Sequence, residues 1–181
     1  RLTAAFADFV RRGPTRRAAG HVPVLAAAPA LIEARYRAVR AKARAIAPQS
    51  PPADYHRLRI VGKRLRYAIE FFAPLYGPPA LDLVARLVAL QDLLGEHQDA
   101  CVAADELRAL SVAPSLPPLA VFVMGQTAAR YQQQAAALRA RFPEVYAELR
   151  GAPWKTLRQT LRERAPAPSP APLPQRPPPA P

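Results

Sequence analysis

Basic side chains are concentrated in one short stretch, HRLRIVGKRLRY, which spans residues 56–67. Six of its twelve residues are cationic or can become so: His56, Arg57, Arg59, Lys63, Arg64 and Arg66. On a helix of about 100° per residue, four of them form a row on the side roughly opposite the apolar stripe of Leu58, Val61, Leu65, Ile69 and Phe72, and Arg57 and Arg64 share a flank. The row is about 15 Å long from residue 56 to residue 66. Because a guanidinium group offers a planar fork of donors, the chemistry indicated is the binding of phosphate or carboxylate groups.

Three interpretations of this row stay open. Like charges four residues apart, such as Arg59 and Lys63, destabilise a helix by a few tenths of a kcal/mol, so something should offset them. Water and salt on a solvated face would do so. A carboxylate stripe formed by Asp92, Glu96 and Asp99 could also pair with the row, although three acids leave a cationic surplus. The third interpretation is an extended polyanion, whose charges repeat along its length as these cations do.

The preceding basic segment extends the pattern. Arg37, Arg40 and Arg44 lie on one face of a helix, which solvent exposure alone would also explain. Residues 35–66 carry a net charge of +9, whereas residues 67–110 carry −5. If the two basic helices pack side by side, we expect their rows to wall a groove, because clefts lined by one sign of charge capture polyanions. Arg130 is a further candidate on a later helix.

The elements that position these residues are helical. Apolar residues recur at spacings of three and four, which predicts an all-α antiparallel bundle with long helices. Helices are expected at about 2–12, 23–47, 54–76, 79–110 and 118–141, with a weaker helical ending after that. Asp54 is a candidate N-cap, and Gly95 is expected to kink or split its helix. We divide the chain into an N-terminal helix and linker (1–20), a bundle (21–164) and a disordered Pro-rich tail (165–181).

Composition excludes several classes of protein. The formal net charge is +13, and Cys101 is the one cysteine, so no disulfide framework or Cys-based metal site is expected. No apolar run is long enough to span a bilayer and no signal-peptide pattern begins the chain, so a cytoplasmic protein is expected. Asp92, Glu96 and Asp99 near His97 raise metal-assisted phosphate hydrolysis as an alternative. We expect no enzyme, cofactor or metal, because no metal-binding or phosphate-loop motif occurs and His97 continues an apolar stripe.

Two segments resemble a known family, the CHAD domain (conserved histidine α-helical domain). They are HRLRIVGKRLRYAIEFFAPLYG at 56–77 and LVALQDLLGEHQDACVAADEL at 87–107. The first is similar to the family pattern at His56, Arg59, Lys63, Arg64, Leu65, Arg66, Tyr67 and Glu70. The second is similar to it at Leu90, Gln91, Leu94, Gly95 and Asp99. The resemblance covers roughly residues 22–160 and is closest to the second helical half of the domain.

The resemblance implies binding of inorganic polyphosphate by a helical bundle, without catalysis and with residence at bacterial or archaeal polyphosphate granules. The site residues it favours are His56, Arg57, Arg59, Lys63, Arg64, Arg66, Tyr67, Arg37, Arg40, Arg44 and Arg130. Glu70 and Asp99 would orient the cations. His56 would add charge in mild acid.

One departure concerns completeness. A full CHAD domain has two similar halves, and this chain contains a single His/Arg-rich helix. The first half is lost, lies upstream, or is supplied by a second copy in a homodimer. Nucleic acid is the second candidate partner, because phosphate contacts are independent of sequence. It ranks lower since single-strand binders interleave aromatic residues, and the basic faces offer only Tyr36, Tyr55 and Tyr67.

Overall fold

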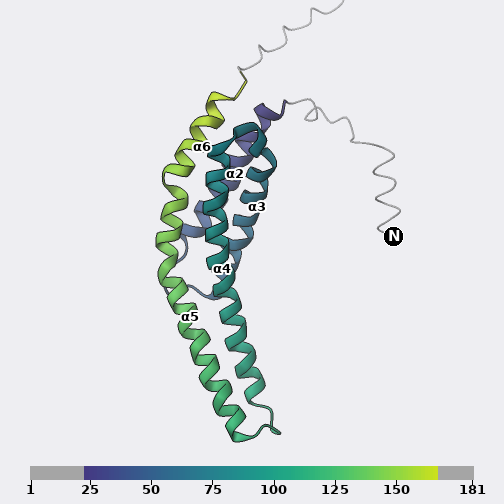
Figure 1. The fold of residues 1–181 in the computed structure, drawn as a ribbon, viewed down its shortest axis with the longest axis vertical. Coiled ribbons are helices and arrows are strands. Elements are labelled where there is room, and N and C mark those ends of the chain that lie inside the picture. Colours follow the sequence, from purple (N-terminus) through teal and green to yellow (C-terminus); the bar gives the residue numbers. More distant parts are fainter. Residues whose placement is uncertain (1–22, 167–181) are drawn as a thin grey trace, which may run out of the picture.

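The computed structural model describes residues 23–166 (Figure 1). Within that range the chain forms five helices and no strand. They are α2 (Val24–Arg44), α3 (Pro52–Tyr76), α4 (Pro78–Ser111), α5 (Pro118–Arg150) and α6 (Ala152–Glu163). The expected all-α bundle is therefore confirmed. The helix expected at residues 2–12 and nearly all of the Pro-rich tail lie outside the described residues, so the domain boundaries stay predictions.

Proline rather than a polar side chain marks the helix beginnings. α3, α4, α5 and α6 each have proline within their first two positions, where its missing N–H costs nothing. The prediction that Asp54 caps α3 is wrong, because Pro51 occupies the N-cap. Asp54 lies in the first turn instead and forms an ion pair with Arg57. There its negative charge still interacts favourably with the helix dipole.

A single residue, Gly77, separates α3 from α4. Its φ of 65° lies in the left-handed region, which a residue with a Cβ adopts only at a cost. The chain reverses at this residue, so α4 packs against α3 over much of its length. The tight turn therefore sets the register between the basic helix and its neighbour.

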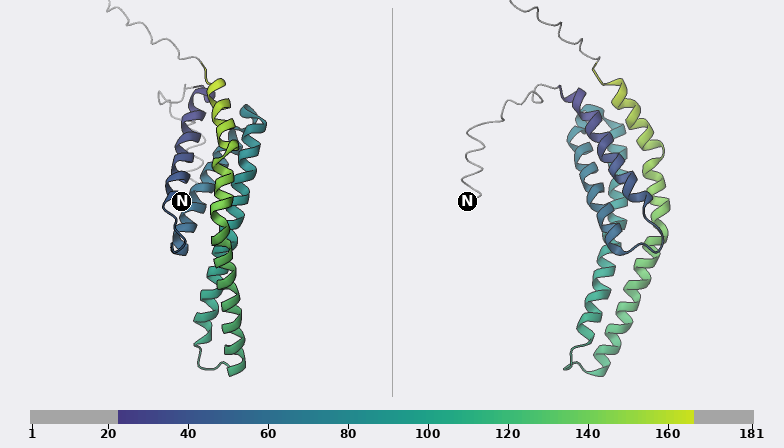
Figure 2. Two further views of the ribbon diagram at one scale, coloured as in Figure 1. Left: turned by 90° about the vertical axis from the view of Figure 1, so that its left-hand side faces the viewer. Right: turned by 180° about the vertical axis from the view of Figure 1, so that it is seen from behind.

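α4 has nearly its expected bounds, whereas α5 is longer than its sequence suggests. The prediction that Gly95 splits its helix is wrong, because α4 is one helix of 34 residues. α5 continues past the expected end at residue 141 and includes Pro143. A 34-residue helix is about 50 Å long, against about 37 Å for the 25 residues of α3. As a result, the ends of α4 and α5 project beyond the other helices as a two-helix hairpin (Figures 1 and 2).

The core lies between α2, α3, α4 and the joined α5 and α6. The fully buried positions recur at spacings of three and four, as expected for helices that bury one face. On α3 and α4 these positions are Leu58, Leu65, Ile69, Leu83, Leu87, Leu90 and Leu94. Tyr55, Leu149 and Leu157 are buried equally well. The predicted apolar stripes of the two helices are thus confirmed, with Val61 only half-buried.

His97 continues the buried stripe of α4, as its spacing predicts. It is 1% exposed, and its ring lies 4.6 Å from that of Tyr55. Its Nε2 is 3.6 Å from the Cys101 sulfur, while Nδ1 is buried without a hydrogen-bond partner. Burial, and secondly the charge of Arg139, lower the pKa of His97 below its ordinary value. The imidazole is therefore a neutral part of the core.

This environment makes stability depend on pH. The unfolded chain has an ordinary His97 with a pKa of about 6.5, so below that pH it binds more protons than the folded chain. The free energy of unfolding should then fall as pH decreases below about 6.5, by at most about 1.4 kcal/mol per pH unit. We expect His97→Leu to remove the part of this pH dependence that is due to His97. Urea denaturation at about pH 5 and about pH 7 measures the free energy of unfolding of the variant and the parent. Identical pH dependence in the variant and the parent would contradict this assignment.

Candidate functional site

The basic row of α3 lies beside the core rather than opposite to it. Arg59, Lys63 and Arg66 are half-buried, and they flank the face that carries Leu58, Leu65 and Ile69. α4 lies against this side of α3. The two helices come close at Gly62, where a Cβ added to the glycine would lie 4.0 Å from both Cγ and Nε2 of Gln91 on α4. The cations therefore line the seam between α3 and α4.

Arg59 packs onto the one position of α4 that lacks a side chain. A Cβ built on Gly95 would lie 3.5 Å from Arg59 Nε and 3.6 Å from its Nη2. Nε is buried and has no hydrogen-bond partner. Because a buried donor without a partner costs about 1–3 kcal/mol, this nitrogen favours an acceptor that enters the seam.

Arg66, two turns further along α3, also has a buried Nε atom without a hydrogen-bond partner. The nearest carboxylate oxygen, Glu70 Oε1, lies 3.6 Å from this nitrogen. Its guanidinium carbon lies 5.0 Å from the centroid of the Tyr67 ring. Glu70 thus pairs loosely with Arg66, and the orienting role expected for it stays a prediction. The row therefore carries two orphaned guanidinium donors on one side.

The remaining cations of α3 are more exposed. Arg57, Arg64 and His56 are exposed, and Tyr67 is 54% exposed. Arg57 is the member of this group that pairs with an acid, Asp54.

The acids of α4 leave the row unpaired. Asp92, Glu96 and Asp99 are exposed, and no ion pair joins them to a cation anywhere in residues 23–166. Arg59, Lys63 and Arg64 have no ion pair within the same range. The interpretation in which the carboxylate stripe neutralises the basic row therefore fails.

The second basic row does not face the first. Arg37, Arg40 and Arg44 line hollows with residues of α5 and α6, including Tyr146 and Trp154. Tyr36, on the same side of α2, stacks directly on Trp154 at 3.6 Å between ring centroids. The expectation that the two rows wall one groove is wrong, because α2 turns its arginines toward α6 while α3 turns its row toward α4. The α3 row is therefore a half-buried surface beside α4 that the α2 row does not face.

Arg130 lies apart from both rows. It is exposed on α5, nearer to the tip of the projecting hairpin than Gln132. Gln132 in turn lines a hollow with Pro52, the first residue of α3. The structure therefore does not bring Arg130 to the basic row.

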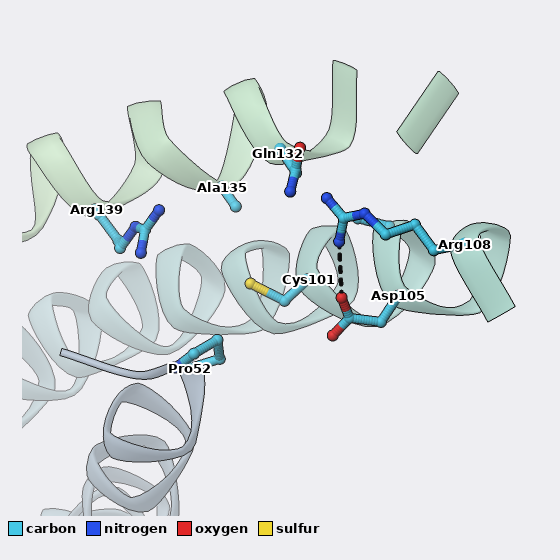
Figure 3. A pocket seen from close by; sticks show the side chains of 8 residues that line it. Pro52, Cys101, Asp105, Arg108, Gln132, Ala135 and Arg139 are labelled. Atoms are coloured by element: carbon cyan, nitrogen blue, oxygen red, sulfur yellow. Dashed lines mark hydrogen bonds and ion pairs between the residues drawn. The ribbon is translucent and has the colours of Figure 1, made fainter. Parts of the chain in front are cut away.

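That hollow is lined by a solvent-exposed ion pair (Figure 3). It lies between α4 and α5 near the beginning of α3, where Arg108 donates to Asp105 at 2.9 Å. Cys101 points into it, and burial raises the pKa of its thiol. A thiol held in its neutral form is a weak nucleophile, so the hollow offers no reactive cysteine.

One feature of the seam does not follow from the apolar pattern. It is a polar lining on α4, where Gln91 Nε2 and Gln98 Oε1 are buried without hydrogen-bond partners. Gln91 belongs to the family pattern. On α3, Phe71 is 77% exposed one turn after Tyr67, whereas Phe72 lies on the predicted apolar stripe and is buried.

Residues 23–166 contain neither a cluster of metal-ligand side chains nor a membrane-spanning helix. No group of three or more His, Cys, Asp or Glu side chains there could hold a metal ion. Likewise, none of the helices described is long and apolar enough to cross a membrane.

The contact between Gly95 and Arg59 gives a prediction. Gly95→Ala should raise the free energy of unfolding by about 0.5–1 kcal/mol, because alanine favours helix and the new Cβ meets Arg59 at ordinary contact distance. Gly125→Ala, where no atom lies within 4 Å, is the matched control for helix propensity. Thermal unfolding measures both. A loss of stability confined to the Gly95 variant would show that the guanidinium is packed more tightly than this geometry implies.

The fold and this surface define a helical-bundle protein with a cationic seam suited to phosphate groups. A family model described as CHAD domain matches residues 1–108, which is more than half of the chain. The chain therefore belongs to the CHAD domain family, as its motifs predict. The match begins earlier and ends earlier than the expected 22–160, so it includes the basic helices and most of α4 but not α5 or α6.

The other comparisons add no relative. No curated protein matches the chain. No solved structure matches it either. CHAD domains are associated with polyphosphate binding in general and are binding domains rather than typical catalysts.

Proposed function

We propose that this chain binds inorganic polyphosphate along the seam between α3 and α4, without catalysing a reaction. The observation that carries the proposal is the row of half-buried cations that the protein leaves unpaired. Arg59 and Lys63 have no ion pair among residues 23–166, and Arg66 has a loose one. Membership of a family associated with polyphosphate supports the choice of ligand.

The seam supplies two kinds of interaction. Net charge attracts the polyanion, with a steep dependence on salt because bound counterions are released. The buried Nε atoms of Arg59 and Arg66 supply directed donors at two points about 10 Å apart along the helix. A flexible chain of phosphates has acceptor oxygens along its whole length, so it can reach both points.

The other residues have secondary parts in this proposal. Arg57, Arg64 and the exposed His56 widen the polar surface beside the row, and the exposed Tyr67 hydroxyl can donate to a phosphate oxygen. Arg37, Arg40 and Arg44 belong to a different seam, and Arg130 to the hairpin. Residence at polyphosphate granules would follow from this binding.

Nucleic acid is the second candidate, because one observation favours it. Tyr67 and Phe71 are exposed on adjacent turns of α3 beside the row, where a base could stack on either ring. Phe71→Ala should therefore weaken binding of single-stranded RNA while leaving polyphosphate binding unchanged, because phenylalanine offers no hydrogen-bond donor to phosphate.

A competition assay separates the two ligands. Long-chain polyphosphate should displace labelled RNA at a much lower concentration of phosphate equivalents, since it presents more charge per unit length and needs no stacking. RNA should displace labelled polyphosphate poorly. The reverse order would replace polyphosphate with nucleic acid as the ligand.

A further inference from the structure

Two adjoining hollows lie on the other side of the bundle, where α2 meets α5 and α6. One has a volume of about 290 Å³ and is lined mainly by apolar groups, among them Ile46 and Phe142. The other, of about 300 Å³, is lined mainly by cations and aromatic rings. Arg44, Tyr146 and Arg150 line both, so an apolar chamber opens directly beside a basic one.

The basic chamber has an excess of charge that the protein does not neutralise. Arg40, Arg44, Arg150 and Lys155 line it. In the part of the chain that is described, none of these four is in an ion pair. The one nearby pair joins Arg158 to Glu33 at 3.5 Å. Four free cations at one concavity favour a ligand with several negative charges.

Aromatic rings fix the shape of both chambers. Tyr36 and Trp154 stack at 3.6 Å with an interplanar angle of 6°. Phe142 and Tyr146 stack at 5.8 Å and 10°, and the Arg150 guanidinium lies 6.0 Å from the Tyr146 ring centroid. Tyr146 is therefore a half-buried residue shared by both hollows, with Phe142 stacked on its ring and Arg44 and Arg150 lining the same two hollows.

The electrostatics of the tyrosines agree with this geometry. Burial, and secondly Tyr146, raise the pKa of Tyr36 to about 12. Burial also raises the pKa of Tyr146, while Arg150, Arg40 and Arg44 act in the opposite direction. The two hydroxyls thus remain protonated near neutral pH and lie close to three of the cations. They can donate hydrogen bonds to the same anion.

We propose that these joined hollows bind a nucleoside polyphosphate. The phosphates lie among Arg40, Arg44, Arg150 and Lys155, and the base occupies the apolar chamber against Tyr146. An inorganic phosphate chain would satisfy the cations but leave the apolar chamber empty, whereas a nucleotide fills both. The residues are separate from the α3 row, so this site stands or fails independently of polyphosphate binding at the seam.

The chain carries its own reporter for this site. Trp154 is the one tryptophan in the sequence, and it lines the basic chamber. Titration with ATP should therefore change tryptophan fluorescence in a saturable way. Inorganic tripolyphosphate, which lacks the base, should bind at least about tenfold more weakly, because no group enters the apolar chamber.

A double variant tests the phosphate contacts. Arg44→Gln with Arg150→Gln should weaken ATP binding by about tenfold or more, since each removes a charge-assisted contact. Arg35→Gln with Arg141→Gln is the matched control, because both are exposed arginines on the same two helices and neither lines the hollows. Replacing Arg59, Lys63 and Arg66 with glutamine should leave the ATP response intact.

Each contrary result overturns the proposal. Absence of a saturable response to ATP, or equal losses in the test and control variants, would remove the site. Equal affinity for ATP and tripolyphosphate would remove the role of the apolar chamber and hence the nucleotide. Tyr146→Leu removes both the ring and the hydroxyl, so it should reduce ATP binding by a larger factor than tripolyphosphate binding, and equal losses for both ligands would also contradict the assignment.

Discussion

Replacing Arg59, Lys63 and Arg66 together with glutamine is expected to weaken polyphosphate binding and to reduce the slope of log affinity against log salt by about two to three. Each cation that binds a phosphate releases about one counterion, so the change in slope reports how many of the three bind phosphate. The three side chains are half-buried at the surface and pack beside the core without entering it, so the variant should stay folded. Calorimetry at several salt concentrations measures the slope.

A variant with the same reduction in charge provides the control. Arg35, Arg141 and Arg162 are exposed and lie outside the α3 row, and none is in an ion pair within the described range. Their replacement with glutamine lowers the net charge equally, so it should reduce nonspecific attraction without removing the directed hydrogen bonds. If both triple variants lower affinity and slope alike, net charge alone attracts the polyanion and the seam has no special role.

The second large effect concerns the stability of the bundle. Leu94→Ala is expected to lower the free energy of unfolding by about 2–5 kcal/mol, because Leu94 is fully buried and its truncation leaves a cavity. Leu94 also directly precedes Gly95, on which Arg59 packs. Loosening this part of α4 should therefore weaken polyphosphate binding as well as stability.

Leu110 supplies the comparison within the same helix. It is 56% exposed on the projecting end of α4, so Leu110→Ala should change the free energy of unfolding by less than about 0.5 kcal/mol. Urea denaturation of both variants measures the difference in the free energy of unfolding. An unchanged slope m in each variant checks that unfolding remains two-state. Similar losses of stability in the two variants would mean that the projecting hairpin is covered in solution.

Much of the fold follows from local pattern. The spacing of Leu83, Leu87, Leu90 and Leu94 predicts a buried stripe, and His97 lies within it as that spacing requires. Helix beginnings are less predictable, because proline competes with acidic and polar residues for the first turn, as the displacement of Asp54 from the N-cap shows. α4 is not split at Gly95 because a glycine costs a helix only about 1 kcal/mol, which tertiary packing easily offsets.

The sequence by itself determined that α3 carries a continuous cationic row, because helical periodicity places those side chains along one side of the helix. Only the tertiary structure decided which neighbour each row meets. Periodicity is a property of one helix, whereas the partner on each flank depends on packing between residues far apart in sequence. Thus Arg59 lies against Gly95, while the arginines of α2 face Trp154 across a seam that no local pattern could indicate.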